Sequence, residues 1–260
     1  MPIVEVNGVP IHYETSGTGR PVLFIHGLGS STRDWERQVE RFSDAYQMIT
    51  VDLRGHGRSG KPAGSYSIGG FAEDVAVLLD QLDGGALPVV GISLGAMVGF
   101  QMAADRPDLV ESLMAINAVQ GFEVKSVGMK TQIAIRKLIA RFAGMEKIGE
   151  ILAGRLFPDE DMGAERELMA ERWAENDKQA YQASLQAILD WPGVVDEMSR
   201  FEKPIVVVAS DQDYTPVETK QPYVDRMPSA ELVVIENAHH AVPVERPEKF
   251  NAVLKDFLTS

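Results

Sequence analysis

One serine in this chain has the neighbours of a reactive hydroxyl. The stretch VGISLGA places Gly91 and Gly95 two residues before and two residues after Ser93, directly after the apolar run LPVV. Glycine at both positions would let backbone pass close to a serine on a tight strand-to-helix turn, where side chains would collide with neighbouring backbone. The N-terminus of the following helix would supply N–H groups that favour developing negative charge. The alternative interpretation is an ordinary helix N-cap with small neighbours.

Two later segments offer the base and the acid that a serine nucleophile needs. A serine hydroxyl is a poor nucleophile until a base removes its proton, and a carboxylate orients that base. In the chain order serine, acid, histidine, the base comes late in the sequence. Asp211 and Asp213 follow the apolar run PIVVVA, and His239 and His240 follow the run LVVI. The residues by themselves leave the choice within each pair open.

Short apolar runs predict the strands that must position these residues. Unbroken runs are typical of strands buried on both faces, as in a parallel sheet. The turn Asn7-Gly8 favours a hairpin between the first two strands. Helical stretches alternate with the runs, which indicates βαβ units and an α/β fold. We expect strands at Ile3–Val6, Ile11–Thr15, Pro21–Ile25, Gln47–Val51, Leu87–Val90, Leu113–Ile116, Pro204–Ala209 and Leu232–Ile235, and helices at Thr32–Phe42, Ile68–Leu82, Leu94–Asp105 and Arg246–Leu258.

The pattern changes between residues 121 and 200, where helical stretches follow one another without a convincing strand. We expect helices there at Lys130–Phe142, Glu165–Ala174 and Lys178–Leu189. This predicts a core domain made of residues 1–120 and 201–260, with a helical cap inserted at residues 121–200. An insertion after the carboxyl end of a strand can lie over the place where open α/β sheets bind ligands.

Composition excludes several other kinds of protein. The 260 residues carry a formal net charge of −13, which argues against nucleic acid and anionic membranes as partners. The absence of cysteine excludes disulfides and thiolate metal sites. No apolar run approaches the roughly 18 residues of a spanning helix, and the first residues lack the pattern of a signal peptide. We therefore expect a cytoplasmic protein without metal or cofactor, as a monomer or a homodimer.

Four motifs together resemble those of the α/β-hydrolase family, over essentially the whole chain outside the helical insertion. FIHGLGSSTRDW resembles the H-G-x-G oxyanion loop, VDLRGHGRSGKP the segment after the fourth strand, and GISLG the G-x-S-x-G elbow. ASDQDYTP and AHHAVPVERPEKF resemble the acid and base segments. The resemblance implies a mostly parallel sheet flanked by helices, with a helical cap.

The resemblance also implies a role for each site residue. Aligned on the family's patterns, Asp213 is the acid and His240 is the base, and Ser93 is the nucleophile. The backbone N–H groups of Leu28 and Leu94 would form the oxyanion hole. The chain departs from the usual pattern at two positions, with Ser210 and His239 where glycine is common.

Among family members, the chain resembles small carboxylesterases and 3-oxoadipate enol-lactonase-like enzymes. We therefore expect a serine hydrolase that cleaves a small-molecule carboxylic ester or lactone through an acyl-enzyme. Carbon–carbon bond hydrolases and perhydrolases share the same triad, and an acyltransferase or a non-catalytic ligand receptor on the same fold are further alternatives. Basic residues of the cap would either recognise a substrate carboxylate or form a solvated face: Lys130, Arg136, Lys137 and Arg141.

The remaining histidines have structural interpretations. In the family's loop, His26 bonds backbone, and we expect the same here. His56 and Asp52 are expected to organise the turn DLRGHG. His12 alternates with apolar residues on an early strand, which predicts a surface position.

Overall fold

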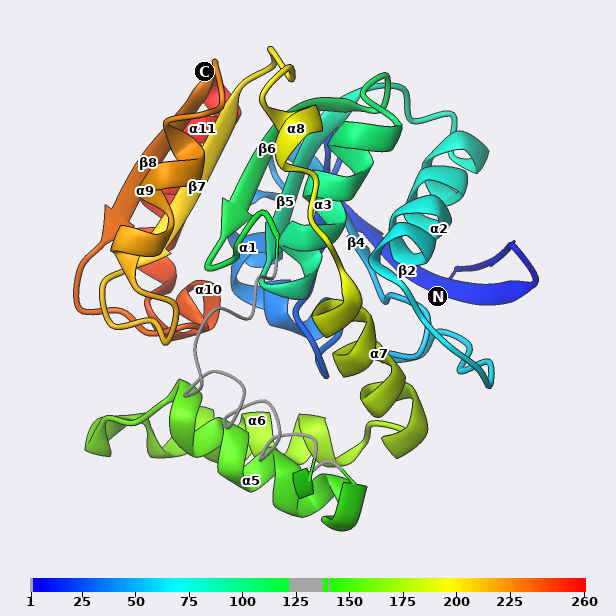
Figure 1. Ribbon diagram of the computed structural model, residues 1–260, viewed down its shortest axis with the longest axis vertical. Helices are drawn as coiled ribbons and strands as arrows, with labels where there is room; N and C mark the ends of the chain where they lie inside the picture. Colours follow the sequence, from blue (N-terminus) through cyan, green and yellow to red (C-terminus); the bar gives the residue numbers. More distant parts are fainter. Residues whose placement is uncertain (1, 122–137, 140) are drawn as a thin grey trace.

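The computed structural model describes residues 2–121, 138–139 and 141–260. Its centre is an eight-stranded sheet of order β1-β2-β4-β3-β5-β6-β7-β8 (Figure 1). The strands β1 and β2 form a hairpin, β2 pairs antiparallel with β4, and the strands from β3 to β8 pair in parallel. The strands are β1 (Ile3–Val6), β2 (Val9–Ser16), β3 (Arg20–Ile25), β4 (Tyr46–Val51), β5 (Leu87–Ile92), β6 (Val110–Ile116), β7 (Ile205–Ser210) and β8 (Ala230–Ile235).

Helices cover both faces of the sheet (Figure 1). The helices α2 and α3 pack with one side of the strands, and α1 and α11 pack with the other side. Along β3, Leu23 and Ile25 belong to the first cluster and Val22 and Phe24 to the second. Both faces of this strand are therefore buried, which explains its unbroken apolar run. These helices are α1 (Glu36–Phe42), α2 (Ile68–Gln81), α3 (Leu94–Asp105) and α11 (Pro247–Thr259), with the 3₁₀ turn η1 (Thr32–Trp35) before α1.

Three further helices lie together beyond the carboxyl ends of the strands (Figure 1). They are α5 (Met145–Leu156), α6 (Gly163–Ala174) and α7 (Lys178–Asp190), with the 3₁₀ turn η2 (Glu160–Met162) between α5 and α6. Most of the expected helix Lys130–Phe142 lies outside the described residues. The exact division into a core and a cap at residues 121–200 stays a prediction.

Short helical elements lie in the connections before and after the last two strands. They are α8 (Val195–Met198) before β7, η3 (Val217–Thr219) and α9 (Gln221–Val224) between β7 and β8, and α10 (Val242–Glu245) before α11. The loops from β7 to η3 and from β8 to α10 therefore open at the same edge of the sheet as the turn between β5 and α3. That edge is where the sequence places the candidate acid, base and nucleophile.

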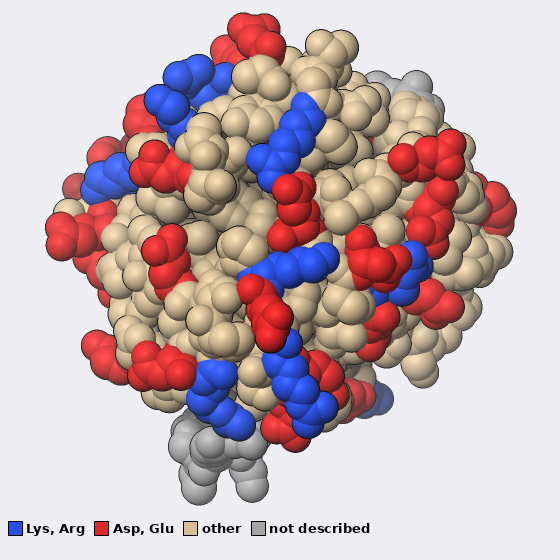
Figure 2. Space-filling model, turned by 90° about the horizontal axis from the view of Figure 1, so that it is seen from above, with Lys and Arg blue, Asp and Glu red and all other residues tan. Residues whose placement is uncertain are grey.

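The surface carries mixed charges. On the face shown in Figure 2, Lys and Arg side chains lie beside Asp and Glu side chains and do not gather into one basic patch. None of the helices in the described part of the chain combines the length and the apolarity needed to cross a bilayer. The cytoplasmic location and the oligomeric state stay predictions.

Candidate active site

Ser93 occupies a strained turn between β5 and α3. Its backbone has φ +55° and ψ −113°, in the region of positive φ that non-glycine residues rarely adopt. Its N–H donates to the carbonyl of Ile116, 2.9 Å away on the neighbouring strand. A Cβ at Gly91 would meet the backbone of Gly95, and a Cβ at Gly95 would meet the carbonyl of Ile25. The two glycines are thus required by backbone packing, as the sequence pattern predicted.

The structure pairs Asp213 with His240. Nδ1 of His240 lies 2.8 Å from Oδ1 of Asp213, and both side chains are nearly or fully buried. The other two candidates have different partners. Oδ1 of Asp211 accepts a hydrogen bond from the N–H of Ala238 at 3.1 Å, and Nδ1 of His239 lies 2.9 Å from Glu245. Asp211 and His239 therefore hold the loop that carries His240, and neither belongs to the pair.

The second oxygen of Asp213 also has partners. Oδ2 accepts a hydrogen bond from the Thr215 hydroxyl and lies 3.3 Å from Nζ of Lys220. Burial by itself raises the pKa of Asp213, but the adjacent His240, the Thr215 hydroxyl and the Lys220 cation outweigh it and hold the pKa below its ordinary value. Asp213 is therefore ionised at neutral pH, as an acid that stabilises an imidazolium must be.

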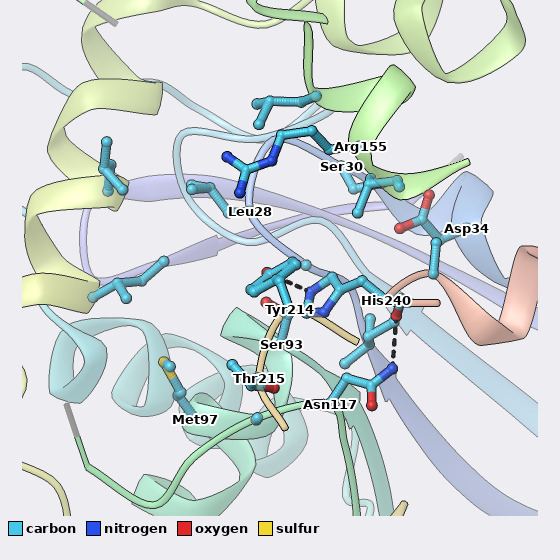
Figure 3. A pocket seen from close by; sticks show the side chains of 18 of the residues that line it. Leu28, Ser30, Asp34, Ser93, Met97, Asn117, Arg155, Tyr214, Thr215 and His240 are labelled. Carbon is cyan, nitrogen blue, oxygen red and sulfur yellow. Dashed lines mark hydrogen bonds between the residues drawn. The ribbon is translucent and has the colours of Figure 1, made fainter. Parts of the chain in front are cut away.

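Nε2 of His240 lies 2.8 Å from the hydroxyl of Tyr214. The two rings stack with centroids 4.2 Å apart and planes 29° apart. Figure 3 shows Tyr214 beside His240 at the pocket, with Ser93 close below them. Tyr214 follows Asp213 directly in the chain, and the sequence analysis did not single it out.

Asn117 is a further residue that the sequence analysis missed. It follows β6 with φ +47°, and its Nδ2 donates to the carbonyl of His240 at 2.9 Å (Figure 3). The same group donates to Oγ of Ser210 at 2.8 Å, while Oδ1 accepts from the N–H of Ser210 at 2.8 Å. Asn117 thus ties the ends of β6 and β7 to the His240 loop. The serine at position 210, unusual for the family, provides the hydroxyl for this network.

A cavity of about 250 Å³ contains Ser93 and His240. Leu28 lines it as well, and Leu94 is the first residue of α3, where a helical N–H has no acceptor within the helix. Leu28 thus lines the same cavity as Ser93, and Leu94 follows Ser93 directly in the chain. The oxyanion role of their amides stays a prediction. The helices α5, α6 and α7 contribute mainly apolar side chains to the cavity wall: Leu152, Leu156, Met169, Trp173, Leu185, Ile188 and Leu189.

Two charged side chains also line this cavity. Asp34 comes from the turn before α1 and Arg155 from the last turn of α5 (Figure 3). Burial raises the pKa of Asp34, although a hydrogen bond from Ser30 opposes the shift, and its Oδ1 is buried without a partner among the described residues. Within the described part of the chain, the guanidinium of Arg155 makes no ion pair or hydrogen bond. The wall thus combines a cation with an acid whose ionisation is disfavoured.

The other histidines are structural, with one correction. His26 bonds the carbonyl of Gly27 and the N–H of Leu53. Burial lowers the pKa of His56 to about 3, so His56 is neutral. His12 does not lie on the surface: it is 1% exposed, with Nδ1 2.9 Å from Asp52. The surface prediction was wrong because the turn after β4 brings the buried carboxylate of Asp52 against β2.

One cluster outside the cavity has donor atoms of metal-ligand type. Those of Asp159, His239 and Glu245 all lie within 4.8 Å of one another. However, Arg246 lies 3.3 Å from Asp159 and 3.6 Å from Glu245, so a guanidinium already supplies the positive charge. We therefore interpret this cluster as an ion-pair network that fixes the His240 loop.

Known proteins resemble this chain over most of its length. A family model described as "Alpha/beta hydrolase family" matches residues 22–253. The chain is 30% identical over 259 residues to 3-oxoadipate enol-lactonase 2 of Acinetobacter baylyi, covering 96% of this chain and 94% of that one. It is 28% identical over 264 residues to (E)-2-((N-methylformamido)methylene)succinate hydrolase of the same organism, covering 97% and 95%.

Solved structures agree as well. The enol-lactonase from Burkholderia xenovorans LB400 superposes with a TM-score of 0.90 at 25% identity, and the match covers 100% of both chains. The chain therefore belongs to the alpha/beta hydrolase family, as the family model, the fold and these similarities show.

Proposed function

We propose that this protein is a serine hydrolase that cleaves a small-molecule carboxylic ester or lactone. The observation that carries the proposal is the 2.8 Å hydrogen bond between His240 and Asp213, beside a cavity that also contains Ser93 at positive φ. A buried acid, an oriented imidazole and a half-buried hydroxyl that lines a cavity at a helix N-terminus are the parts that acyl transfer needs.

The reaction would proceed in two halves. In the first, Oγ of Ser93 attacks the acyl carbon while Nε2 of His240 takes the hydroxyl proton. The acyl–oxygen bond then breaks, and the imidazolium returns the proton to the leaving alkoxide. In the second half, water attacks the acyl-enzyme, His240 takes its proton, and Ser93 leaves protonated. Asp213 stabilises the imidazolium, and the amides of Leu28 and Leu94 bind the oxyanion in both halves.

The cavity also favours a substrate with a free carboxylate. Arg155 brings a guanidinium to an otherwise largely apolar wall, and guanidinium groups bind carboxylates through two parallel hydrogen bonds. The names of the two relatives point the same way, since oxoadipate and succinate are dicarboxylates. Arg155 thus takes the role that the sequence offered to other basic residues. Of those, Arg141 is exposed, with its guanidinium over the ring of Phe142, and the other three lie outside the described residues.

The test is turnover of p-nitrophenyl esters from acetate to octanoate, beside a small enol-lactone, by the wild type and by Ser93→Ala. The proposal requires hydrolysis by the wild type that disappears in the variant. It also requires a Ser93-linked acyl adduct in rapid-quench mass spectrometry. Hydrolysis that survives in Ser93→Ala would refute the serine mechanism. Cleavage restricted to carbon–carbon bonds, or binding without turnover, would select one of the alternative functions.

A further inference from the structure

A lysine lies buried behind the candidate acid. The side chain of Lys220 is 0% exposed, and its Nζ lies 3.3 Å from Oδ2 of Asp213. Lys220 stands between η3 and α9, and its side chain folds back along the loop. Nζ also donates to the carbonyl of Thr215 at 2.5 Å and to its hydroxyl at 2.8 Å. All three contacts involve residues of one loop, which begins just after β7.

A buried lysine is rare, because an ammonium group loses its hydration and requires paired partners. Burial lowers the pKa of Lys220, and the charge of Asp213 opposes that shift. The ammonium is therefore kept inside by the carboxylate, and it holds one of the two carboxylate oxygens. The other oxygen, Oδ1, remains for Nδ1 of His240 at 2.8 Å.

This arrangement places two cations on one carboxylate whenever His240 takes a proton. Before proton transfer, Asp213 and Lys220 neutralise each other. After transfer, the imidazolium shares Asp213 with the ammonium, so the carboxylate stabilises it less than an unshared carboxylate would.

Other charged or titratable groups surround the same three residues. They are Tyr214 at Nε2 of His240, Tyr223 near Asp213, Glu218 near Lys220, Asp34 and Arg155 on the cavity wall, and the pair of His239 and Glu245 beside His240 in the loop. Lys220 is the ammonium that directly contacts the carboxylate among the described residues. Its charge can be removed without touching any of these groups.

We propose that Lys220 is a positioning residue that orients Asp213 and shares its negative charge, so that the carboxylate holds a protonated His240 less strongly and hydrolysis extends to lower pH. The inference rests on the proposed function, since it assigns Asp213 and His240 their roles in the triad. An imidazole that is harder to protonate stays available as a base in more acidic solution.

The test compares Lys220→Met and Lys220→Gln with Lys220→Arg. Methionine and glutamine remove the charge, glutamine keeps a hydrogen-bond donor, and arginine keeps both. The dependence of kcat/KM on pH would be measured with one p-nitrophenyl ester, after thermal melts show which variants are folded. In parallel, NMR of labelled histidine would follow the titration of the His240 ring, assigned with His240→Gln. The NMR titration needs no turnover.

We expect the acid limb of kcat/KM to move up by about 1.5 pH units in the neutral variants. This is the effect of a unit charge about 8 Å away at an effective dielectric constant of about 20. The NMR midpoint should move by the same amount, and Lys220→Arg should keep both near the wild-type values. An unmoved limb in a folded neutral variant would overturn the inference, as would an equal shift in Lys220→Arg. If the wild type cleaves no ester, the proposed function fails, while the NMR titration still decides the role of Lys220.

Discussion

Tyr214 and His240 share a hydrogen bond at the nitrogen that the proposed mechanism assigns to Ser93. The hydroxyl of Tyr214 lies 2.8 Å from Nε2, and the two rings stack. Nε2 has one lone pair when Nδ1 carries the proton toward Asp213. A tyrosine hydroxyl that donates to this lone pair competes with the Ser93 hydroxyl for the base. The resting arrangement therefore has to change before acyl transfer begins.

Replacing Tyr214 by phenylalanine should accelerate acylation. The substitution keeps the stacked ring and removes the competing donor. Since such a hydrogen bond contributes about 0.5–1.5 kcal/mol, we expect kcat/KM to rise about 3- to 10-fold. Stopped-flow release of p-nitrophenol measures this step. Tyr46→Phe is the matched control, because Tyr46 begins β4, at the edge of the sheet opposite the candidate site, and its hydroxyl bonds the carbonyl of Leu258. A fall in kcat/KM would instead assign the hydroxyl a direct role with the substrate.

Replacing Arg155 by glutamine should separate acidic from neutral substrates. We expect kcat/KM for a monoester of succinic acid to fall about 10-fold or more, since a charged hydrogen-bonded pair is lost, while the neutral acetate ester stays within about 2-fold. Lys147→Gln, on the same helix but paired with Glu150 at the surface, should leave both substrates unaffected. Equal losses with both substrates would contradict carboxylate recognition by Arg155.

Replacing Asn117 by alanine should lower both stability and kcat. The substitution leaves the buried N–H of Ser210 and the carbonyl of His240 without the hydrogen bonds of Asn117. Each unsatisfied buried group lowers the free energy of unfolding by about 1–3 kcal/mol. We expect Tm to fall by about 5 °C or more, and kcat to fall with KM little changed, because the His240 loop loses its anchor. Asn251→Ala, which removes a half-buried acceptor for Gln38, should lower Tm less and leave kcat unchanged. A normal kcat in Asn117→Ala would show that the loop is held without this side chain.

Replacing Gly95 by alanine should destabilise the turn at Ser93. The new Cβ would meet the carbonyls of Ile25 and His26, and overpacking of this kind costs about 1–3 kcal/mol. Gly69→Ala is the matched control, since a Cβ there has nothing within 4 Å and alanine favours the helix. Urea unfolding should thus rank Gly69→Ala at or above the wild type and Gly95→Ala below it. The reverse order would mean that the backbone around Ser93 shifts enough to accommodate the new Cβ.

Replacing Asp34 by asparagine should stabilise the protein at neutral pH. The folded-state pKa of Asp34 is raised, mainly by burial, so the folded state binds more protons than the unfolded state once the pH exceeds the ordinary aspartate value. Stability is therefore lost as the pH rises through this window, and asparagine, which cannot ionise, avoids that loss. We expect a higher Tm than wild type at pH 7 and a difference that vanishes near pH 4. A Tm advantage that does not change with pH would show that burial of the charge is not its cause.

Much of the fold could be predicted because its signals are local. The helix Leu94–Asp105 and the strand Ile3–Val6 have the predicted bounds, since glycines, turns and apolar runs delimit them. The helix α5 was missed although Met145, Ile148, Leu152 and Leu156 recur in it at helical spacing. Gly149 and Gly154 stand inside this helix, and glycine disfavours helix interiors, so local propensity argued against it.

The candidate site also contains residues that the sequence predicts and residues that it does not. The pair of Asp213 and His240 could be predicted because chain order and family spacing single them out. Asn117, Tyr214 and Lys220 could not be predicted, because each is a single polar residue in a loop. The role of each depends on contacts that cannot be inferred from spacing along the sequence. His12 was placed wrongly for a related reason. Alternation along β2 cannot reveal that the buried carboxylate of Asp52, in the turn after β4, lies against His12.

The residues of α5, α6 and α7 that line the cavity have a consequence for how this protein can change. They fall between Leu152 and Leu189, one continuous stretch of sequence, whereas Ser93, Asp213 and His240 belong to segments outside it. Recombination or repeated substitution within that stretch would change this part of the cavity wall and leave the proposed nucleophile, acid and base unaltered. Much of the cavity wall and the proposed catalytic residues are thus encoded in separate passages of the gene.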